Sequence, residues 1–120
     1  MLSLPLPVRI FLCTQPADMR RSFDGLAQMV REFLQSDPLS GHLFVFRSKR
    51  GDRLKLLYWD SDGLAIWYKR LEKGSFRFPV APAHSHGLEI RAADLTMLLD
   101  GVDLASVRRQ SRYQRPPVSC

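Results

Sequence analysis

The chain has 120 residues with 18 basic and 12 acidic side chains; hydrophobic residues make up 45% of it and charged residues 25%. These proportions are typical of one soluble globular domain and exclude a wholly disordered chain, a collagen and, with only two cysteines, a small disulfide-stabilised protein. No apolar run approaches the roughly 20 residues that cross a bilayer, and the first residues lack the basic start of a signal peptide.

The first third of the chain predicts a strand followed by a helix. Residues 8–13 are a short apolar run of strand-favouring residues, which indicates a buried strand. Asp18 then has the character of a helix N-cap, and apolar residues recur after it every three or four positions. This spacing predicts an amphipathic helix over 18–35, about four to five turns long, that stops before Pro38.

The middle third predicts an antiparallel meander. Residues 42–47 and 53–59 are rich in aromatic and branched side chains, and the polar connector between them contains Gly51, which can adopt a positive φ. These two segments predict a β-hairpin with a basic tip. Residues 64–70 indicate a third strand, with a short helix as the alternative, and 76–79 a further extended segment.

The last third predicts a loop, a short strand, a helix and a tail. Residues 80–87 are small residues, proline and histidine, and 88–90 suit one more short strand. The apolar spacing over 92–99 predicts a two-turn helix that Gly101 would end. Residues 108–120 have no apolar period, so we expect a disordered basic tail.

These elements predict a single α+β domain over 1–107, followed by the 108–120 tail. An antiparallel β-meander over about 42–79 is joined by the 8–13 strand. One long amphipathic helix packs on one face of the sheet, and a short C-terminal helix follows. We expect the core to form between the apolar side of the long helix and the inward face of the meander.

Positive charge is concentrated in the meander and the tail. Residues 47–77 carry nine basic and four acidic side chains, a net charge of +5, whereas residues 1–46 are neutral. Arg53 and Lys55 alternate with leucines, so their cations should share one face of the strand. Cations interleaved with aromatic residues suit a nucleic acid, because the cations bind phosphates and the rings stack on exposed bases.

We therefore predict a nucleic-acid-binding face on the meander. Its predicted phosphate contacts are Arg47, Lys49, Arg50, Arg53, Lys55, Lys69, Arg70 and Lys73. Trp59 and Trp67 are predicted to supply stacking or partner surfaces. The alternative is a solvated sheet face with its aromatic residues in the core, and the pattern does not choose between DNA and RNA. The arginines of the tail are typical either of basic arms that follow phosphates or of a solubilising terminus.

Metal-ligand patterns are incomplete. The 60–63 turn, Asp-Ser-Asp-Gly, has the look of a metal loop, yet an EF-hand would need a glutamate where Arg70 and Leu71 stand. A turn rich in aspartate and glycine also serves a hairpin. His84 and His86 form a His-x-His pair without further ligands at zinc spacing. We predict no metal, no cofactor and no catalytic residue.

Four blocks of sequence carry a family resemblance. They span 18–26, 40–47, 50–63 and 67–74 and include the motifs Gly-His-Leu-Phe-Val-Phe and Tyr-Trp-Asp. The pattern resembles the accessory TnpB-type protein, encoded by the second open reading frame of IS66-family bacterial insertion sequences. The resemblance covers about residues 8–103. It implies a role in transposition beside a separate, larger transposase that holds the acidic catalytic residues, and it is distinct from the RNA-guided nucleases that share the TnpB name.

Charge and resemblance together predict a non-catalytic accessory protein for transposition. We expect it to bind DNA at the ends of the element through the basic hairpin and to help assemble the transposase complex. Its expected partners are DNA and the transposase of the same element, and its expected location is the cytoplasm, associated with the nucleoid. One alternative is an adaptor that binds the transposase through the aromatic segments 58–59 and 67–68 without contacting DNA. Another is a metal-dependent nuclease that uses Asp60 and Asp62.

Overall fold

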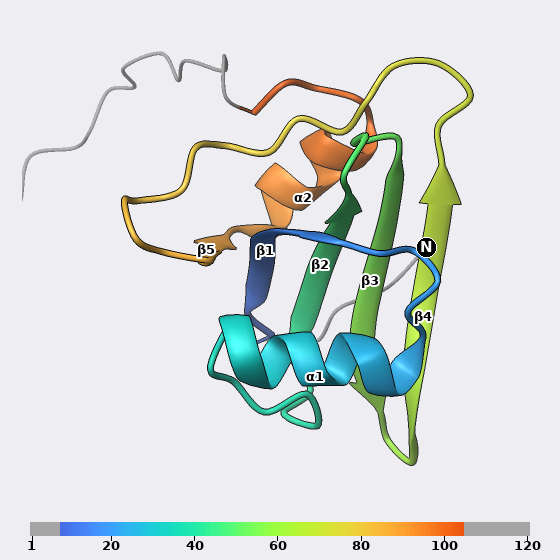
Figure 1. The fold of residues 1–120 in the computed structure, drawn as a ribbon, viewed down its shortest axis with the longest axis vertical. Coiled ribbons are helices and arrows are strands. Elements are labelled where there is room, and N and C mark those ends of the chain that lie inside the picture. Colours follow the sequence, from blue (N-terminus) through green and yellow to red (C-terminus); the bar gives the residue numbers. More distant parts are fainter. Residues whose placement is uncertain (1–7, 105–120) are drawn as a thin grey trace, which may run out of the picture.

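A computed structural model describes residues 8–104 of the chain, which form one mixed five-stranded sheet and two helices (Figure 1). In chain order the elements are β1 (Ile10–Ala17), α1 (Phe23–Phe33), β2 (Leu43–Ser48), β3 (Arg53–Asp60), β4 (Gly63–Arg70), β5 (Gly87–Ile90) and α2 (Ala92–Leu99). The strand order is β4-β3-β2-β1-β5. β1 and β2 run parallel, with α1 in the connection between them, and the other neighbours are antiparallel. This arrangement confirms the predicted α+β class.

The predicted meander is present as β2, β3 and β4. Gly51, in the turn between β2 and β3, has the expected positive φ of +82°. Pairing between β3 and β4 is continuous over all eight residue pairs, so residues 64–70 belong to a strand and not to a helix. The extended segment 76–79 joins no sheet, which corrects the prediction that the meander continues to residue 79. It is instead held beside the β2–β3 turn, where the Phe76 N–H donates to the Gly51 carbonyl at 2.7 Å.

Helix α1 is shorter than predicted, because it begins at Phe23 and ends at Phe33. Asp18 does not cap it; the N-cap position belongs to Ser22. The Asp18 carboxylate accepts a hydrogen bond from the Arg20 backbone N–H at 2.9 Å instead, and this closes a turn before the helix. Sequence periodicity overextended the helix because the residues before Phe23 contact the sheet without being helical.

Apolar side chains pack on both faces of the sheet, whereas the sequence predicted a core between the long helix and one face of the meander and assigned no face to the short C-terminal helix. α1 covers one face, where Leu26 and Phe44 are fully buried, and we call this the α1 face (Figure 1). α2 covers the other, the α2 face, where Leu98 and Val45 are fully buried. Residues 43–46 of β2 are all buried because successive side chains of a strand point to opposite faces and both are covered.

The C-terminal elements follow the sequence prediction closely. α2 spans Ala92–Leu99, and at its start the backbone N–H of Arg91 donates to the Asp94 carboxylate at 3.1 Å. Gly101 has a φ of +86° just after the helix, as a helix-ending glycine requires. Neither helix of the described range is long and apolar enough to span a membrane. The predicted tail, 108–120, lies outside the described residues.

Candidate nucleic-acid interface

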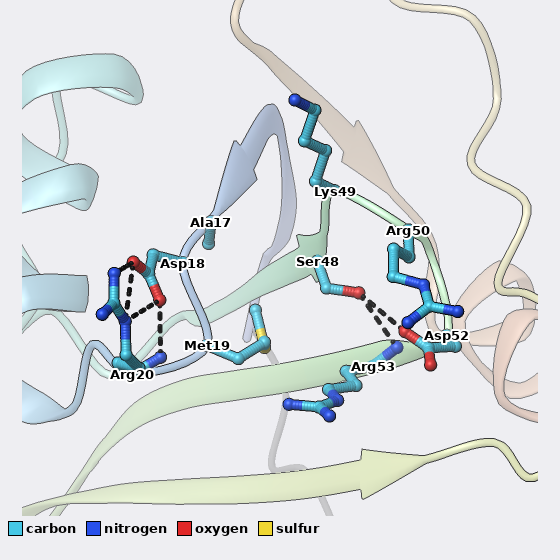
Figure 2. A pocket seen from close by; sticks show the side chains of 9 residues that line it. All are labelled: Ala17, Asp18, Met19, Arg20, Ser48, Lys49, Arg50, Asp52 and Arg53. Atoms are coloured by element: carbon cyan, nitrogen blue, oxygen red, sulfur yellow. Dashed lines mark hydrogen bonds and ion pairs between the residues drawn. The ribbon is translucent and has the colours of Figure 1, made fainter.

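A basic pocket of about 330 Å³ lies where the end of β1 meets the turn between β2 and β3 (Figure 2). Residues 17–20 line one side of it, and residues 48–50, 52 and 53 line the other. The two segments meet because β1 runs parallel to β2, with Ala17 paired to Ser48 at their ends. The ionisable residues of the pocket are Arg20, Lys49, Arg50, Arg53, Asp18 and Asp52.

Both carboxylates of the pocket are engaged by protein donors. The Arg20 guanidinium lies 2.7 Å from the Asp18 carboxylate, and its hydrogen bonds lower the pKa of Asp18 to about 2. The Asp52 carboxylate accepts a hydrogen bond from the Ser48 hydroxyl at 3.2 Å. The hydroxyl oxygen in turn accepts the Arg53 backbone N–H at 3.2 Å (Figure 2). Asp52 therefore stabilises the turn, and Asp18 pairs with Arg20. Neither carboxylate pairs with Lys49, Arg50 or Arg53.

Lys49, Arg50 and Arg53 are the cations that this pocket offers to a ligand. Within residues 8–104 their side chains make no ion pair and donate no hydrogen bond. Lys49 and Arg50 are exposed and Arg53 is half-buried, and Figure 2 shows the Lys49 side chain extending away from the other pocket residues. Three unpaired positive charges around one hollow attract an anion or a polyanion.

The pairing of β3 with β4 brings a further cation next to this pocket. Arg53 lies directly opposite Arg70, so the two side chains share one face of the sheet. The Arg70 guanidinium lies 3.0 Å from the Glu72 carboxylate, which raises the pKa of Arg70 and partly offsets its charge. Arg70 therefore borders the basic pocket, but it already has a carboxylate partner.

Lys55 is buried, although it was predicted to contact phosphates. Its side chain is among the buried charged groups, with the residue 7% exposed. Its ammonium group donates to the backbone carbonyls of Met19 and Arg21, both at 2.8 Å, and lies 4.6 Å from the centre of the Tyr68 ring. These contacts anchor the segment before α1 to the sheet. The Lys55 ammonium group is therefore not available to a phosphate.

Arg47 points to the α2 face, away from the basic pocket. Its guanidinium donates to the Phe76 carbonyl at 3.1 Å and stacks 4.2 Å from the centre of the Phe78 ring. Burial lowers the pKa of Arg47, and the nearby charge of Arg77 lowers it further. Lys69 also belongs to the α2 face, since it pairs with Leu54, and Lys73 lies in the exposed turn after β4. The eight predicted cations thus divide among several surfaces.

The predicted aromatic surface divides in the same way. Trp59 pairs with Leu64 on the α1 face, whereas Trp67 pairs with Leu56 on the α2 face. Both tryptophans are half-buried. Tyr68 lies on the α1 face, so the 58–59 and 67–68 segments each contribute to both sides of the sheet and form no single patch.

Sequence reasoning missed Arg20 as a pocket residue. The periodic pattern placed Arg20 on the polar side of a helix that was predicted to start at Asp18. A helix with Ser22 as its N-cap would have put Arg20 in the connector after β1. Parallel pairing of β1 with β2 then brings that connector to the β2–β3 turn. The sequence did contain a signal for the later helix start, because Ser22, like Asp18, is a residue type that favours the N-cap position.

The possible metal ligands stay scattered. Asp60 and Asp62 lie in the exposed turn between β3 and β4, and residues 8–104 contain no group of three or more histidine, cysteine, aspartate or glutamate side chains that could hold a metal ion. His86 packs edge-on against Phe33, with ring centres 5.3 Å apart. His84 is exposed and adopts a positive φ of 64°.

The fold and the pocket define a small, basic α+β protein with an exposed cationic turn. A family model described as IS66 Orf2 like protein matches residues 8–109. The chain therefore belongs to the IS66 Orf2-like family, whose members are transposition-associated accessory proteins of insertion sequences.

Two relatives from Sinorhizobium fredii (strain NBRC 101917 / NGR234) are similar to most of the chain. The protein named uncharacterized protein y4jC is 41% identical over 103 residues, which cover 86% of each chain. Uncharacterized protein y4hO is 41% identical over 96 residues, which cover 80% of this chain and 82% of the relative. No solved structure shows a significant match to the chain.

Proposed function

We propose that this IS66 Orf2-like protein is a non-catalytic accessory factor that binds DNA phosphates at the basic pocket and brings the DNA to the transposase. The observation that supports it is the set of three unpaired cations, Lys49, Arg50 and Arg53, beside carboxylates that are already engaged. Arginine forks and lysine ammonium groups are the side chains that bind phosphate oxygens. Family membership supplies the process in which such binding would act.

The arrangement favours backbone contacts over base reading. The three cations lie in and beside one tight turn, where they can approach phosphates from outside the duplex. Contacts of this kind fix the position of a protein on DNA and carry no sequence information by themselves. We therefore expect similar affinities for element-end duplexes and scrambled duplexes. Any preference for the element ends would then come from the transposase.

Phosphate binding makes the affinity for DNA fall as the salt concentration rises. Each phosphate that a protein cation neutralises lowers the slope of log affinity against log salt by about 0.9 on duplex DNA. Contacts by Lys49, Arg50 and Arg53 would together give a slope of about −2.7. Arg20 and Arg70 would add to it only by exchanging their carboxylate partners, Asp18 and Glu72, for phosphates.

The test is fluorescence-anisotropy binding to labelled element-end and scrambled duplexes across a salt series. The test variant combines Arg50→Gln with Arg53→Gln, and the matched control combines Arg31→Gln with Arg91→Gln. Arg31 and Arg91 are exposed arginines outside the pocket, so both double variants lose two positive charges. The pocket variant should bind more weakly, and its slope should become shallower by about 1.8, from about −2.7 to about −0.9. The control should keep most of the affinity and of the slope.

Two outcomes would overturn the proposal. If both double variants lose affinity equally, the net charge of the protein, and not the pocket, attracts the DNA. If the wild-type chain does not bind DNA at low salt, the protein is an adaptor that contacts only the transposase. A pull-down with the transposase would then measure that contact directly.

A further inference from the structure

Within residues 8–104, β4 is a long edge strand without a partner on its outer side. It is eight residues long, lies at one end of the strand order and pairs with β3 without a bulge (Figure 1). The other edge, β5, has only four residues. Proteins usually protect an exposed edge with proline, a bulge or inward-pointing charge, and the central residues of β4, Leu-Ala-Ile-Trp-Tyr, contain none of these.

The outward-facing backbone groups of β4 can be identified from its register. The Leu71 N–H donates to the Asp52 carbonyl at 2.7 Å, on the side of β3. Because these groups alternate along a strand, the N–H and C=O groups of Leu64, Ile66 and Tyr68 point away from β3. Within residues 8–104 these backbone groups have no other partner. The edge therefore offers a row of donors and acceptors for another strand.

We propose that β4 pairs antiparallel with β4 of a second copy of this chain, so that two sheets join into one ten-stranded sheet across a two-fold axis. Antiparallel self-pairing is an isologous contact, which closes as a dimer and leaves only the four-residue β5 as the edge at each end of the joined sheet. Two registers give nearly full overlap of the two strands, one centred on Ile66 and the other on Trp67.

Charge complementarity favours the register centred on Ile66. The start of β4 follows Asp60 and Asp62, whereas its end carries Lys69 and Arg70. When Ile66 lies opposite Ile66 of the second copy, Arg70 lies opposite Asp62 of the second copy, twice by symmetry. When the axis passes through Trp67, Arg70 lies opposite Leu64 instead. An antiparallel partner thus places the acidic end of each strand beside the basic end of the other.

Exposed apolar side chains near β4 also support a second copy of the chain as its partner. Tyr68 is 48% exposed and Phe23 is 45% exposed, two of the most exposed large hydrophobic side chains in the described range. Phe23 begins α1, and that end of the helix lies beside β4 (Figure 1). In the Ile66 register, Tyr68 lies opposite Leu64 of the second copy on the α1 face. The pairing would therefore cover apolar surface as well as backbone groups.

The test is the mass of the full chain by sedimentation equilibrium over a range of concentrations. The wild-type chain should reach the mass of a dimer. Ile66→Pro should raise the dissociation constant about tenfold or more, because the proline removes an outward N–H twice by symmetry while the β3 side of the strand keeps its hydrogen bonds. Ile66→Ala is the matched control, since it loses the side chain but keeps the N–H. It should weaken the dimer less than Ile66→Pro does.

A charge-swap cycle tests the register. Asp62→Lys and Arg70→Glu should each weaken the dimer, because each places like charges opposite one another, and the double variant should recover most of the loss. Circular dichroism checks that every variant is folded.

A single-chain mass at all concentrations, or equal weakening by Ile66→Pro and Ile66→Ala, would overturn the proposal. A monomeric chain that loses transposase binding in Ile66→Pro would assign the edge to the transposase instead. None of these measurements depends on DNA affinity, so they test the dimer independently of the proposed function.

Discussion

Each face of the sheet engages one cation of the predicted DNA-binding hairpin, and each cation holds an irregular segment. Lys55 is buried and Arg47 is half-buried. On the α1 face, the Lys55 ammonium binds two carbonyls of the segment before α1. On the α2 face, the Arg47 guanidinium binds the Phe76 carbonyl and stacks on Phe78. The cations that remain unpaired sit at the turn between the two strands. Lys55 and Arg47 lie where a helix or an extended segment covers the strand, so each cation pairs with backbone carbonyls, whereas the cations in and beside the turn stay available to a ligand.

The largest expected effects test whether the two faces form one cooperative domain. Leu26 belongs to α1 and Leu98 to α2, and both are fully buried. Leu26→Ala and Leu98→Ala should each lower the free energy of unfolding by about 2–5 kcal/mol, measured by urea unfolding. The sum of the two losses should match the double variant, because the side chains lie on opposite faces of the sheet. A loss below about 1 kcal/mol for Leu98→Ala would show that α2 is peripheral to the fold.

Lys55→Met should give the next largest effect. The methionine keeps an apolar chain of similar length but leaves the Met19 and Arg21 carbonyls without their ammonium donor. We expect a loss of about 1–3 kcal/mol in the free energy of unfolding. Lys69→Met, the same change at an exposed site on β4, is the control and should cost about 0.5 kcal/mol or less. Equal losses in the two variants would contradict a structural role for Lys55.

Arg47→Met should cost less than Lys55→Met, about 1 kcal/mol in urea unfolding. Arg47 makes one hydrogen bond and one ring contact and is half-buried, so solvent can replace part of what the substitution removes. The affinity for DNA should stay nearly unchanged, because Arg47 faces away from the basic pocket. A fall in DNA affinity as large as that of the Arg50 and Arg53 variant would place Arg47 in the interface after all.

The difference between these cations also explains what the sequence could and could not predict. The alternation of charged and apolar residues correctly predicted β3, and Gly51 correctly predicted the turn before it. The pattern did not show that β3 is covered on both faces, so Lys55 was predicted to be exposed. The available clue lay in the neighbouring strand, where the unbroken apolar run over 43–46 is typical of a strand buried on both sides.

The parallel pairing of β1 with β2 was not predicted, and it is what builds the pocket. Residues 8–13 indicated a strand, but nothing local in the sequence specifies which neighbour it joins. Pairing depends on the connection through α1, whose start was misplaced at Asp18. Once the helix begins at Phe23, residues 18–22 become a connector that lies beside the β2–β3 turn. Arg20 could therefore be placed only after the helix boundary was known.

The smallest expected effect concerns the ion pair at the mouth of this pocket. Hydrogen bonds from Arg20 lower the pKa of Asp18 from 3.8 to about 2 in the folded protein. A carboxyl group whose pKa is lower in the folded than in the unfolded state stabilises the fold above its unfolded pKa, and that contribution is lost as the pH falls from 3.8 towards 2. Because both side chains are well exposed, the effect on unfolding should be slight.

Carboxyl chemical shifts of Asp18, followed by NMR across this pH range, measure the shift directly. Arg20→Gln should raise the pKa of Asp18 only part of the way back to 3.8, because the backbone N–H of residue 20 still donates to the carboxylate. The stabilities of the wild-type chain and the variant should converge as the pH approaches 2. A pKa of 3.8 in the wild-type protein would show that Arg20 is not held by Asp18. Arg20 would then be a fourth cation available to phosphate, and the salt slope of DNA binding would be steeper by about 0.9.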